Sequence, residues 1–99
     1  MSLDRPIEVL TVCGVGMGSS LMLKMTAEEA LRALGVPATV ECVDVSTARG
    51  KSPDVLLGQE MHTSELPGLA PVTVTVSDFL DAEGLREAMR PKFAEQGWL

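Results

Sequence analysis

The sequence predicts an α/β protein in which a four-stranded parallel sheet lies between layers of helices, a Rossmann-like three-layer sandwich. Two observations lead to this prediction. Short apolar runs alternate along the chain with segments of helical periodicity, and a glycine-rich turn joins the first run to the first helix. The length of 99 residues suits one domain, residues 1–99, and neither repeats nor a linker divide it.

The four predicted strands are short and strongly apolar. Pro6 and the glycine-rich turn bound the first, and the second is rich in β-branched residues. They span residues 7–12, 38–45, 54–58 and 72–76. Because helical crossovers join parallel strands, the expected strand order is 2-1-3-4. This order places the C-terminal end of the first strand at the topological switch point, where α/β proteins bind their ligands.

Two long helices are predicted, over residues 19–34 and 78–94. In the first, apolar residues recur at spacings of three and four, and the Gly-Val-Pro run at 35–37 ends it. The segment 46–53 is predicted to be a polar turn, and 59–71 a loop with room for one helical turn.

Single residues also have predicted packing roles. Met22 and Met25 are expected to fill gaps in the core or to flank the glycine-rich turn. Cys42, together with Val40, is expected to point from the second strand into the core. Trp98 is expected to dock the C-terminal segment on the domain.

Composition and charge exclude several classes of function. Two Phe, one Trp and no Tyr give few stacking platforms, and a net charge of −6 repels a phosphate backbone, so nucleic acid is not an expected partner. No stretch approaches the ~20 apolar residues of a membrane span, and no secretion signal is present, so membrane insertion is not expected. The two cysteines are too few for a disulfide framework and form no paired metal motif, which fits free thiols in the cytoplasm.

The segment Cys-Gly-Val-Gly-Met-Gly-Ser-Ser, residues 13–20, has a chemical signature. Its three glycines let the backbone approach a ligand closely. The helix that follows offers unpaired N–H groups and the positive end of its dipole to an anion, and the two serines add hydroxyl donors. The same field favours the thiolate form of Cys13.

A nucleophile inside an anion-binding loop is suited to carry a phosphoryl group. Cys13 is therefore the predicted phosphorylation site, and no metal or organic cofactor is expected, because the loop amides themselves hold the phosphoryl oxygens. The predicted phosphate-binding residues are Gly14, Val15, Gly16, Met17, Gly18, Ser19 and Ser20. The alternative, that Cys13 is an inert buried thiol, explains neither the glycines nor the serines.

Two other motif interpretations compete. Low-molecular-weight tyrosine phosphatases place a cysteine after their first strand in the pattern C-x5-R-[ST], but here Ser19 stands at the arginine position, so the guanidinium clamp is missing. A dinucleotide site would need a third glycine at Ser19 and a catalytic half that the length does not allow. A cysteine phosphatase or an arsenate-type reductase stays open as the alternative enzyme.

The run from Cys13 to Ser20, extended by Leu-Met-Leu-Lys-Met at 21–25, resembles the IIB components of ascorbate-type sugar phosphotransferase systems. It is similar, more loosely, to the galactitol and the lactose or cellobiose IIB proteins. The likeness extends over nearly the whole chain in length and element order, but only this segment is specific.

The resemblance implies a phosphotransferase that works as a phosphocarrier in the cytoplasm. Its partners would be a IIA protein, whose histidine donates the phosphoryl group to Cys13, and a membrane-embedded IIC transporter, whose bound sugar accepts it. Ascorbate is the sugar that the resemblance favours. A IIB-like regulatory phosphorylation sensor is a further alternative, although the chain has no DNA-binding segment.

Four more residues are candidates for accessory roles. His62, the only histidine, follows the third strand and could reach the same crevice, where it would assist proton movement or line a partner surface. A solvated surface position is the more usual one for a loop histidine. Lys24, in the first helix, could add positive field near the phosphate. Val15 and Met17 are candidates for partner docking.

Overall fold

A computed structural model describes residues 5–13 and 17–99, with the side chains of Cys13 and of residues 17–20 left out of the description. Strands and helices alternate along the chain, as the hydrophobic pattern predicts. The elements are β1 (Ile7–Cys13), α1 (Met17–Leu34), β2 (Ala38–Asp44), α2 (Val45–Ala48), β3 (Val55–Gly58), α3 (Glu60–Thr63), β4 (Val72–Thr75) and α4 (Ala82–Glu95).

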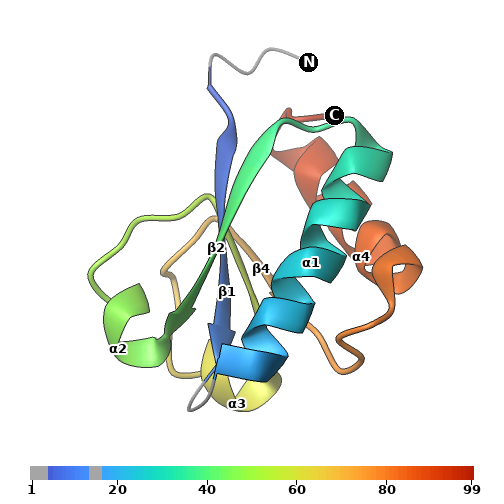
Figure 1. The fold of residues 1–99 in the computed structure, drawn as a ribbon. Helices are drawn as coiled ribbons and strands as arrows, with labels where there is room; N and C mark the ends of the chain where they lie inside the picture. Colours follow the sequence, from blue (N-terminus) through green and yellow to red (C-terminus); the bar gives the residue numbers. More distant parts are fainter. Residues whose placement is uncertain (1–4, 14–16) are drawn as a thin grey trace.

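All four strands are parallel, and their order is β2-β1-β3-β4, which confirms the predicted topology (Figure 1). The register brings the carboxyl ends of the strands to one edge of the sheet. Cys13 lies opposite Asp44 of β2, and the preceding residue, Val12, lies opposite Gly58 of β3. We call this edge, where β1 and β3 end, the C-terminal edge.

The two faces of the sheet are covered unequally. Both long helices, α1 and α4, lie on one face, where the larger core contains Leu23, Val55, Met89 and Phe93 (Figure 1). On the other face a smaller core forms around Leu56, under the short helix α2 and the segment that follows α3. The three predicted layers are therefore present, but single helical turns and loops make up much of the third.

The end of α1 shows how the local sequence positions the elements. Gly35 has a φ of 73°, a left-handed conformation that glycine adopts without strain. The N–H of Gly35 donates to the Arg32 carbonyl and the N–H of Val36 donates to the Leu31 carbonyl, the pattern of a Schellman motif. Since Val36 and Leu31 both lie in the larger core, this turn directs the chain into β2.

Two boundaries differ from the sequence prediction because aspartates cap helices there. Asp44 ends β2 and accepts a hydrogen bond from the Thr47 N–H, so the predicted polar turn begins with the one-turn helix α2. Asp81 accepts from the Gly84 N–H, and α4 consequently begins at Ala82, four residues after the predicted start. The expected helical turn after β3 is present as α3.

The methionine prediction is wrong in part. Met22 and Met25 are 43% and 62% exposed, so neither fills a gap in the core. Cys42 is half-buried on the edge strand β2 and not enclosed. The docking of Trp98 is confirmed, because its ring meets Phe93 edge to face, with ring centroids 5.1 Å apart.

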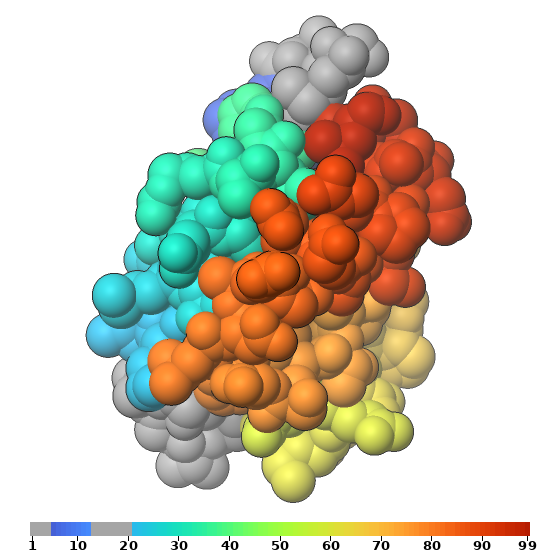
Figure 2. Space-filling model, turned by 90° about the vertical axis from the view of Figure 1, so that its right-hand side faces the viewer, coloured from blue at the N-terminus to red at the C-terminus, as the bar shows by residue number. Residues whose placement is uncertain are grey.

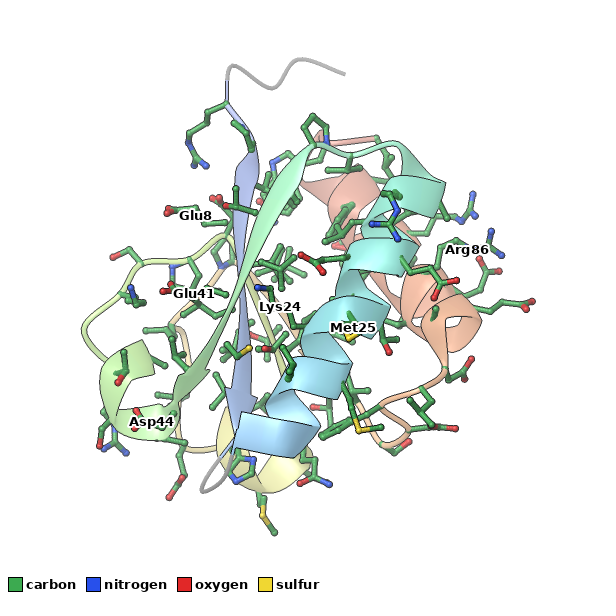
Figure 3. All side chains as sticks on the ribbon, in the orientation of Figure 1. Glu8, Lys24, Met25, Glu41, Asp44 and Arg86 are labelled. Carbon is green, nitrogen blue, oxygen red and sulfur yellow. The ribbon has the colours of Figure 1, made fainter. Side chains whose placement is uncertain are left out.

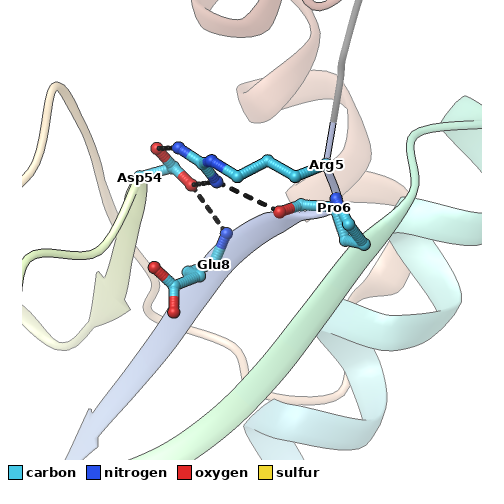
Figure 4. Close-up of polar contacts among 4 residues, drawn as sticks. All are labelled: Arg5, Pro6, Glu8 and Asp54. Atoms are coloured by element: carbon cyan, nitrogen blue, oxygen red, sulfur yellow. Dashed lines mark hydrogen bonds and ion pairs between the residues drawn. The ribbon is translucent and has the colours of Figure 1, made fainter.

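The opposite edge of the sheet is fastened by an ion pair (Figure 4). Asp54, just before β3, accepts hydrogen bonds from both terminal guanidinium nitrogens of Arg5, at 2.7 and 3.0 Å, and one from the Glu8 N–H at 2.7 Å. The guanidinium holds the pKa of the Asp54 carboxyl below its ordinary value. This clamp joins the start of β1 to the start of β3, at the end of the strands away from Cys13.

No helix among the described residues is long and apolar enough to cross a membrane.

Candidate functional site

Cys13 is the last residue of β1, and α1 begins four positions later, at Met17. Of the predicted phosphate-binding residues, Gly14, Val15 and Gly16 lie outside the described residues. Met17, Gly18, Ser19 and Ser20 form the first turn of α1, and their side chains also lie outside the description. The backbone thus places Cys13 and the start of a long helix at the same edge of the sheet.

The first turn of α1 supplies the electrostatics that an anion needs. Because the N–H groups in the first turn of a helix lack an acceptor within that helix, they can donate to an anion, and the helix dipole adds partial positive charge there. With 18 residues, α1 is long enough for this effect to be developed. It begins two residues earlier than predicted, so the first turn contains Met17 and Gly18 as well as the two serines.

Asp44 is the acidic residue closest in register to Cys13, and its carboxylate is engaged by the neighbouring helix. It accepts from the Thr47 N–H at 2.7 Å (Asp44 is labelled in Figure 3). Hydrogen bonds from Thr47 hold the pKa of Asp44 below its ordinary value. The negative charge is therefore stabilised at the start of α2, where the cap satisfies an unpaired N–H group.

His62 lies in α3, which begins two residues after β3 ends, and so stands at the C-terminal edge. The expectation of a solvated surface residue is not met. Its side chain is half-buried, and the imidazole Nδ1 is inaccessible to solvent without a hydrogen-bond partner in the described part of the chain. Sequence reasoning singled out this residue as the lone histidine but could not anticipate its burial.

Lys24 is half-buried on α1, and Figure 3 shows its side chain directed from the helix toward the sheet. It is the eighth residue of α1, which places its Cα roughly 10 Å along the helix axis from Met17. Its contribution to the field at Cys13 stays a prediction.

Exposed apolar side chains form a surface that sequence reasoning missed. Leu21, Met22 and Met25 project from the first turns of α1, and Leu80 from the segment before α4. Figure 2 shows these two segments side by side, and the Thr26 hydroxyl joins them by donating to the Phe79 carbonyl. The signal in the sequence is the methionine pair itself, for which the sequence predicts a place in gaps of the core or beside the glycine-rich turn, and only the core role is contradicted.

Within the described residues, no group of three or more His, Cys, Asp and Glu side chains is placed to hold a metal ion. The geometry at the C-terminal edge consists of a cysteine at a strand end, the N-terminus of a long helix, and a histidine whose Nδ1 has no hydrogen-bond partner among the described residues. These features define a parallel α/β protein in which a cysteine at a strand end comes just before the N-terminus of a long helix.

Comparison with known proteins identifies the class. Residues 8–90 match the model of the family described as "PTS system, Lactose/Cellobiose specific IIB subunit". The ascorbate-specific PTS system EIIB component of Mycoplasma pneumoniae is 27% identical over 89 residues, which cover 87% of this chain and 94% of that protein.

Two solved structures share the fold. The lactose-specific IIB component domain from Streptococcus pneumoniae aligns with a TM-score of 0.56 at 14% identity, covering 92% of this chain and 94% of that one. The Enzyme IIB subunit of a PTS system from Escherichia coli K12 aligns with a TM-score of 0.55 at 14% identity, covering 96% and 99%. At this identity the likeness is one of fold alone.

The match covers most of the chain, so the protein belongs to the lactose/cellobiose IIB subunit family of sugar phosphotransferase systems. It is a phosphocarrier component of such a system, with a phosphotransferase role, as the resemblance around Cys13 predicted.

Proposed function

We propose that Cys13 carries the phosphoryl group, with the backbone of residues 14–20 and the side chains of Ser19 and Ser20 as its cradle. The observation that supports this most directly is the position of Cys13, at the end of β1 and just before the N-terminus of α1. The other cysteine, Cys42, lies inside the edge strand β2, two residues before its end, and the helix that follows is the single turn α2, whose N-terminus the Asp44 carboxylate already caps.

The chemistry consists of two substitutions at phosphorus. In the first, the Cys13 thiolate attacks the phosphoryl group on a IIA histidine that carries a proton on its other ring nitrogen. An S–P bond forms, the N–P bond breaks with its electron pair going to nitrogen, and the histidine leaves as neutral imidazole. In the second, a sugar hydroxyl attacks, an O–P bond forms, and the thiolate leaves with the electron pair of the S–P bond. The hydroxyl proton passes to a base or to water.

The helix terminus favours both steps in the same way. It stabilises the thiolate before the first step and the negatively charged phosphoryl oxygens between the steps, and neither task needs a metal. The missing arginine at position 19 suits a carrier, because a guanidinium clamp would also speed loss of the group to water.

The partners proposed for this chain are a IIA protein as donor and a membrane-embedded IIC transporter with bound sugar as acceptor, with the chain itself in the cytoplasm. Ascorbate is the sugar to test first, because the 27% identical relative bears that specificity in its name. Lactose and cellobiose are tested next, because the description of the matching family names these two sugars.

The test is the intact mass of the protein after incubation with phosphoenolpyruvate, the general phosphotransferase proteins and a cognate IIA. Wild type, Cys13→Ala and the control Cys42→Ala are run side by side. We expect one added phosphoryl group on wild type and on Cys42→Ala, and none on Cys13→Ala. A phosphorylated IIA beside an unmodified wild-type chain would refute the carrier assignment, and Cys13-dependent hydrolysis of an aryl phosphate would favour a phosphatase.

Transfer onward is tested with IIC-containing vesicles and the phosphorylated chain. We expect loss of the phosphoryl group from Cys13 only when the accepted sugar is present. Ascorbate, lactose and cellobiose are compared at equal concentration, and a response to either disaccharide without one to ascorbate would overturn the ascorbate assignment.

A further inference from the structure

His62 stands on a helical turn that the sheet holds in place. The next residue, Thr63, is buried, and its hydroxyl lies 3.3 Å from the Thr75 hydroxyl at the end of β4. Its methyl group also covers Gly58, where a Cβ atom would come within 3.5 Å of it. The position of His62 is therefore set by contacts to β3 and β4.

The imidazole of His62 carries an unsatisfied polar atom. Nδ1 is inaccessible to solvent, and the part of the chain that the structure describes offers it no hydrogen-bond partner. Buried polar groups are nearly always paired, and an unpaired one opposes folding. An unpaired polar atom at a position that the sheet holds in place is a candidate to pair with a group on a ligand.

The location of His62 indicates which ligand this is. Gly58, the last residue of β3, pairs in register with Val12, the residue before Cys13, and α3 begins two positions after Gly58. Figure 1 shows α3 at the end of the sheet where β1 terminates. The turn that carries His62 thus lies at the same edge as the nucleophile and comes from a different part of the chain.

We propose that His62 donates a hydrogen bond from Nδ1–H to an oxygen of the phosphoryl group carried on Cys13. The inference rests on the proposed function, since it needs Cys13 to be the carrier. No bond to His62 forms or breaks, and its proton stays on Nδ1 throughout. The donor adds to the amides of α1 and stabilises charge on the phosphoryl oxygens.

Replacing the donor tests the proposal with a pair of near-isosteric variants. In asparagine the side-chain amide nitrogen is bonded to Cγ, as Nδ1 is in histidine, whereas the glutamine amide nitrogen lies one bond farther out, nearer to the place of Nε2. We therefore compare His62→Ala, His62→Asn and His62→Gln, with Met61→Ala as a control on the same turn, where the side chain is 66% exposed.

The measured quantities are the rate constant of transfer from phosphorylated IIA and the fraction of chain phosphorylated at equilibrium. Loss of a hydrogen bond to a charged acceptor predicts a roughly 10- to 100-fold slower transfer for His62→Ala and His62→Gln. His62→Asn is expected to recover most of the rate, and Met61→Ala to match wild type. Equal rates for wild type and His62→Ala, or recovery by Gln and not by Asn, would overturn the proposal.

A second measurement needs no variant at position 62. The second measurement is the NMR spectrum of the imidazole nitrogens. Because the chain has one histidine, the imidazole ¹⁵N signals of a sample without a histidine tag come from His62 alone. We expect the Nδ1 signal to shift on phosphorylation of wild type and to stay fixed in Cys13→Ala under the same conditions. An unchanged Nδ1 signal in a chain whose mass shows full phosphorylation would refute the role of His62 and leave the carrier function standing. A wild type that takes up no phosphate would refute both.

Discussion

Asp54 illustrates how one side chain can fasten two strands. Its two oxygens accept from Arg5 and from the Glu8 N–H, so it joins the start of β1 to the start of β3. The carboxyl is mostly shielded, at 16% side-chain exposure, whereas Arg5 is 61% exposed. A substitution at Arg5 would remove the ion pair but keep the hydrogen bond from the Glu8 N–H to the Asp54 carboxylate.

Asp54→Ala is expected to lower the free energy of unfolding by about 1–2 kcal/mol, because a backbone donor and a guanidinium both lose their acceptor. Urea denaturation followed by circular dichroism measures the change. Glu41→Ala is the matched control, since it removes an exposed ion pair to Lys51 and should cost at most about 0.5 kcal/mol. Equal effects of the two variants would contradict the role given to Asp54.

Residue chemistry at the site was predictable where it depended on local sequence. The strand end at Cys13 and the helix after it follow from an apolar run, a glycine-rich turn and helical periodicity. The burial of His62 Nδ1 was not predictable, since it depends on how Thr63 packs against Gly58 and Thr75, which lie on other elements.

At the scale of elements, β3 and α3 meet at a glycine. A Cβ atom at Gly58 would lie 3.0 Å from the Val12 carbonyl oxygen and 3.5 Å from the Thr63 methyl carbon. The first contact is tighter than a side chain normally makes with backbone. Gly58 therefore allows α3 to approach the end of β1 closely.

Gly58→Ala is expected to destabilise the fold by roughly 1–3 kcal/mol, because backbone or Thr63 must move to admit the methyl group. Thermal or urea unfolding gives the magnitude. Gly50→Ala serves as control, since its nearest contact would be an ordinary 3.7 Å and its backbone needs no positive φ. A neutral Gly58→Ala would show that the approach of α3 to β1 is loose.

The helix α4 depends on Phe93, which is fully buried and contacts Trp98. Phe93→Ala is expected to cost about 3–5 kcal/mol through lost burial and the cavity left behind. Phe79→Ala, at a half-buried position beside the same core, should cost clearly less. Denaturant midpoints of the two variants, measured together, decide the ranking, and a reversed order would contradict the assignment of Phe93 to the core.

The presence of each strand and long helix was easier to predict than the residues at which it begins and ends. The four strands and two long helices follow from apolar periodicity, and the strand order follows from short helical crossovers. The start of α4 and the presence of α2 escaped prediction because each depends on an aspartate cap, Asp81 or Asp44. Helical spacing did predict the buried side of α1, which carries Leu23, Ala27 and Leu31. Met22 and Met25 lie beside that stripe and are exposed, so the expectation that they fill gaps in the core was wrong.

For the whole molecule, acid should destabilise the fold through the carboxylates that the native state stabilises. The pKa values of Asp44 and Asp54 are held below the ordinary 3.8, by hydrogen bonds from Thr47 and from Arg5 respectively. A carboxyl with a lowered folded-state pKa contributes stability above its unfolded pKa. That contribution is lost as the pH falls below 3.8 and through the folded-state value.

Near neutral pH both carboxyls are ionised in the folded and the unfolded state, so we expect them to cause no change in melting temperature there. Below a pH of about 4 we expect the melting temperature to fall. Asp44→Asn/Asp54→Asn removes both groups and should flatten this part of the profile, at the expense of a lower melting temperature at pH 7. Scanning calorimetry from pH 7 to pH 3 compares the two proteins. A parallel decline in both would show that other groups control acid stability.

The direction of β1 determines where a membrane anchor or a second domain can be joined to this domain. Arg5 stands at one end of the sheet and Cys13 at the other, and seven extended residues separate these ends by roughly 20 Å. Figure 1 shows the last residues returning to the end where β1 begins, and Trp98 holds them there against Phe93. A tether joined at either Arg5 or Leu99 therefore starts on the far side from the chemistry. The domain can be anchored to a surface or fused to a neighbour with its reactive edge still facing arriving proteins.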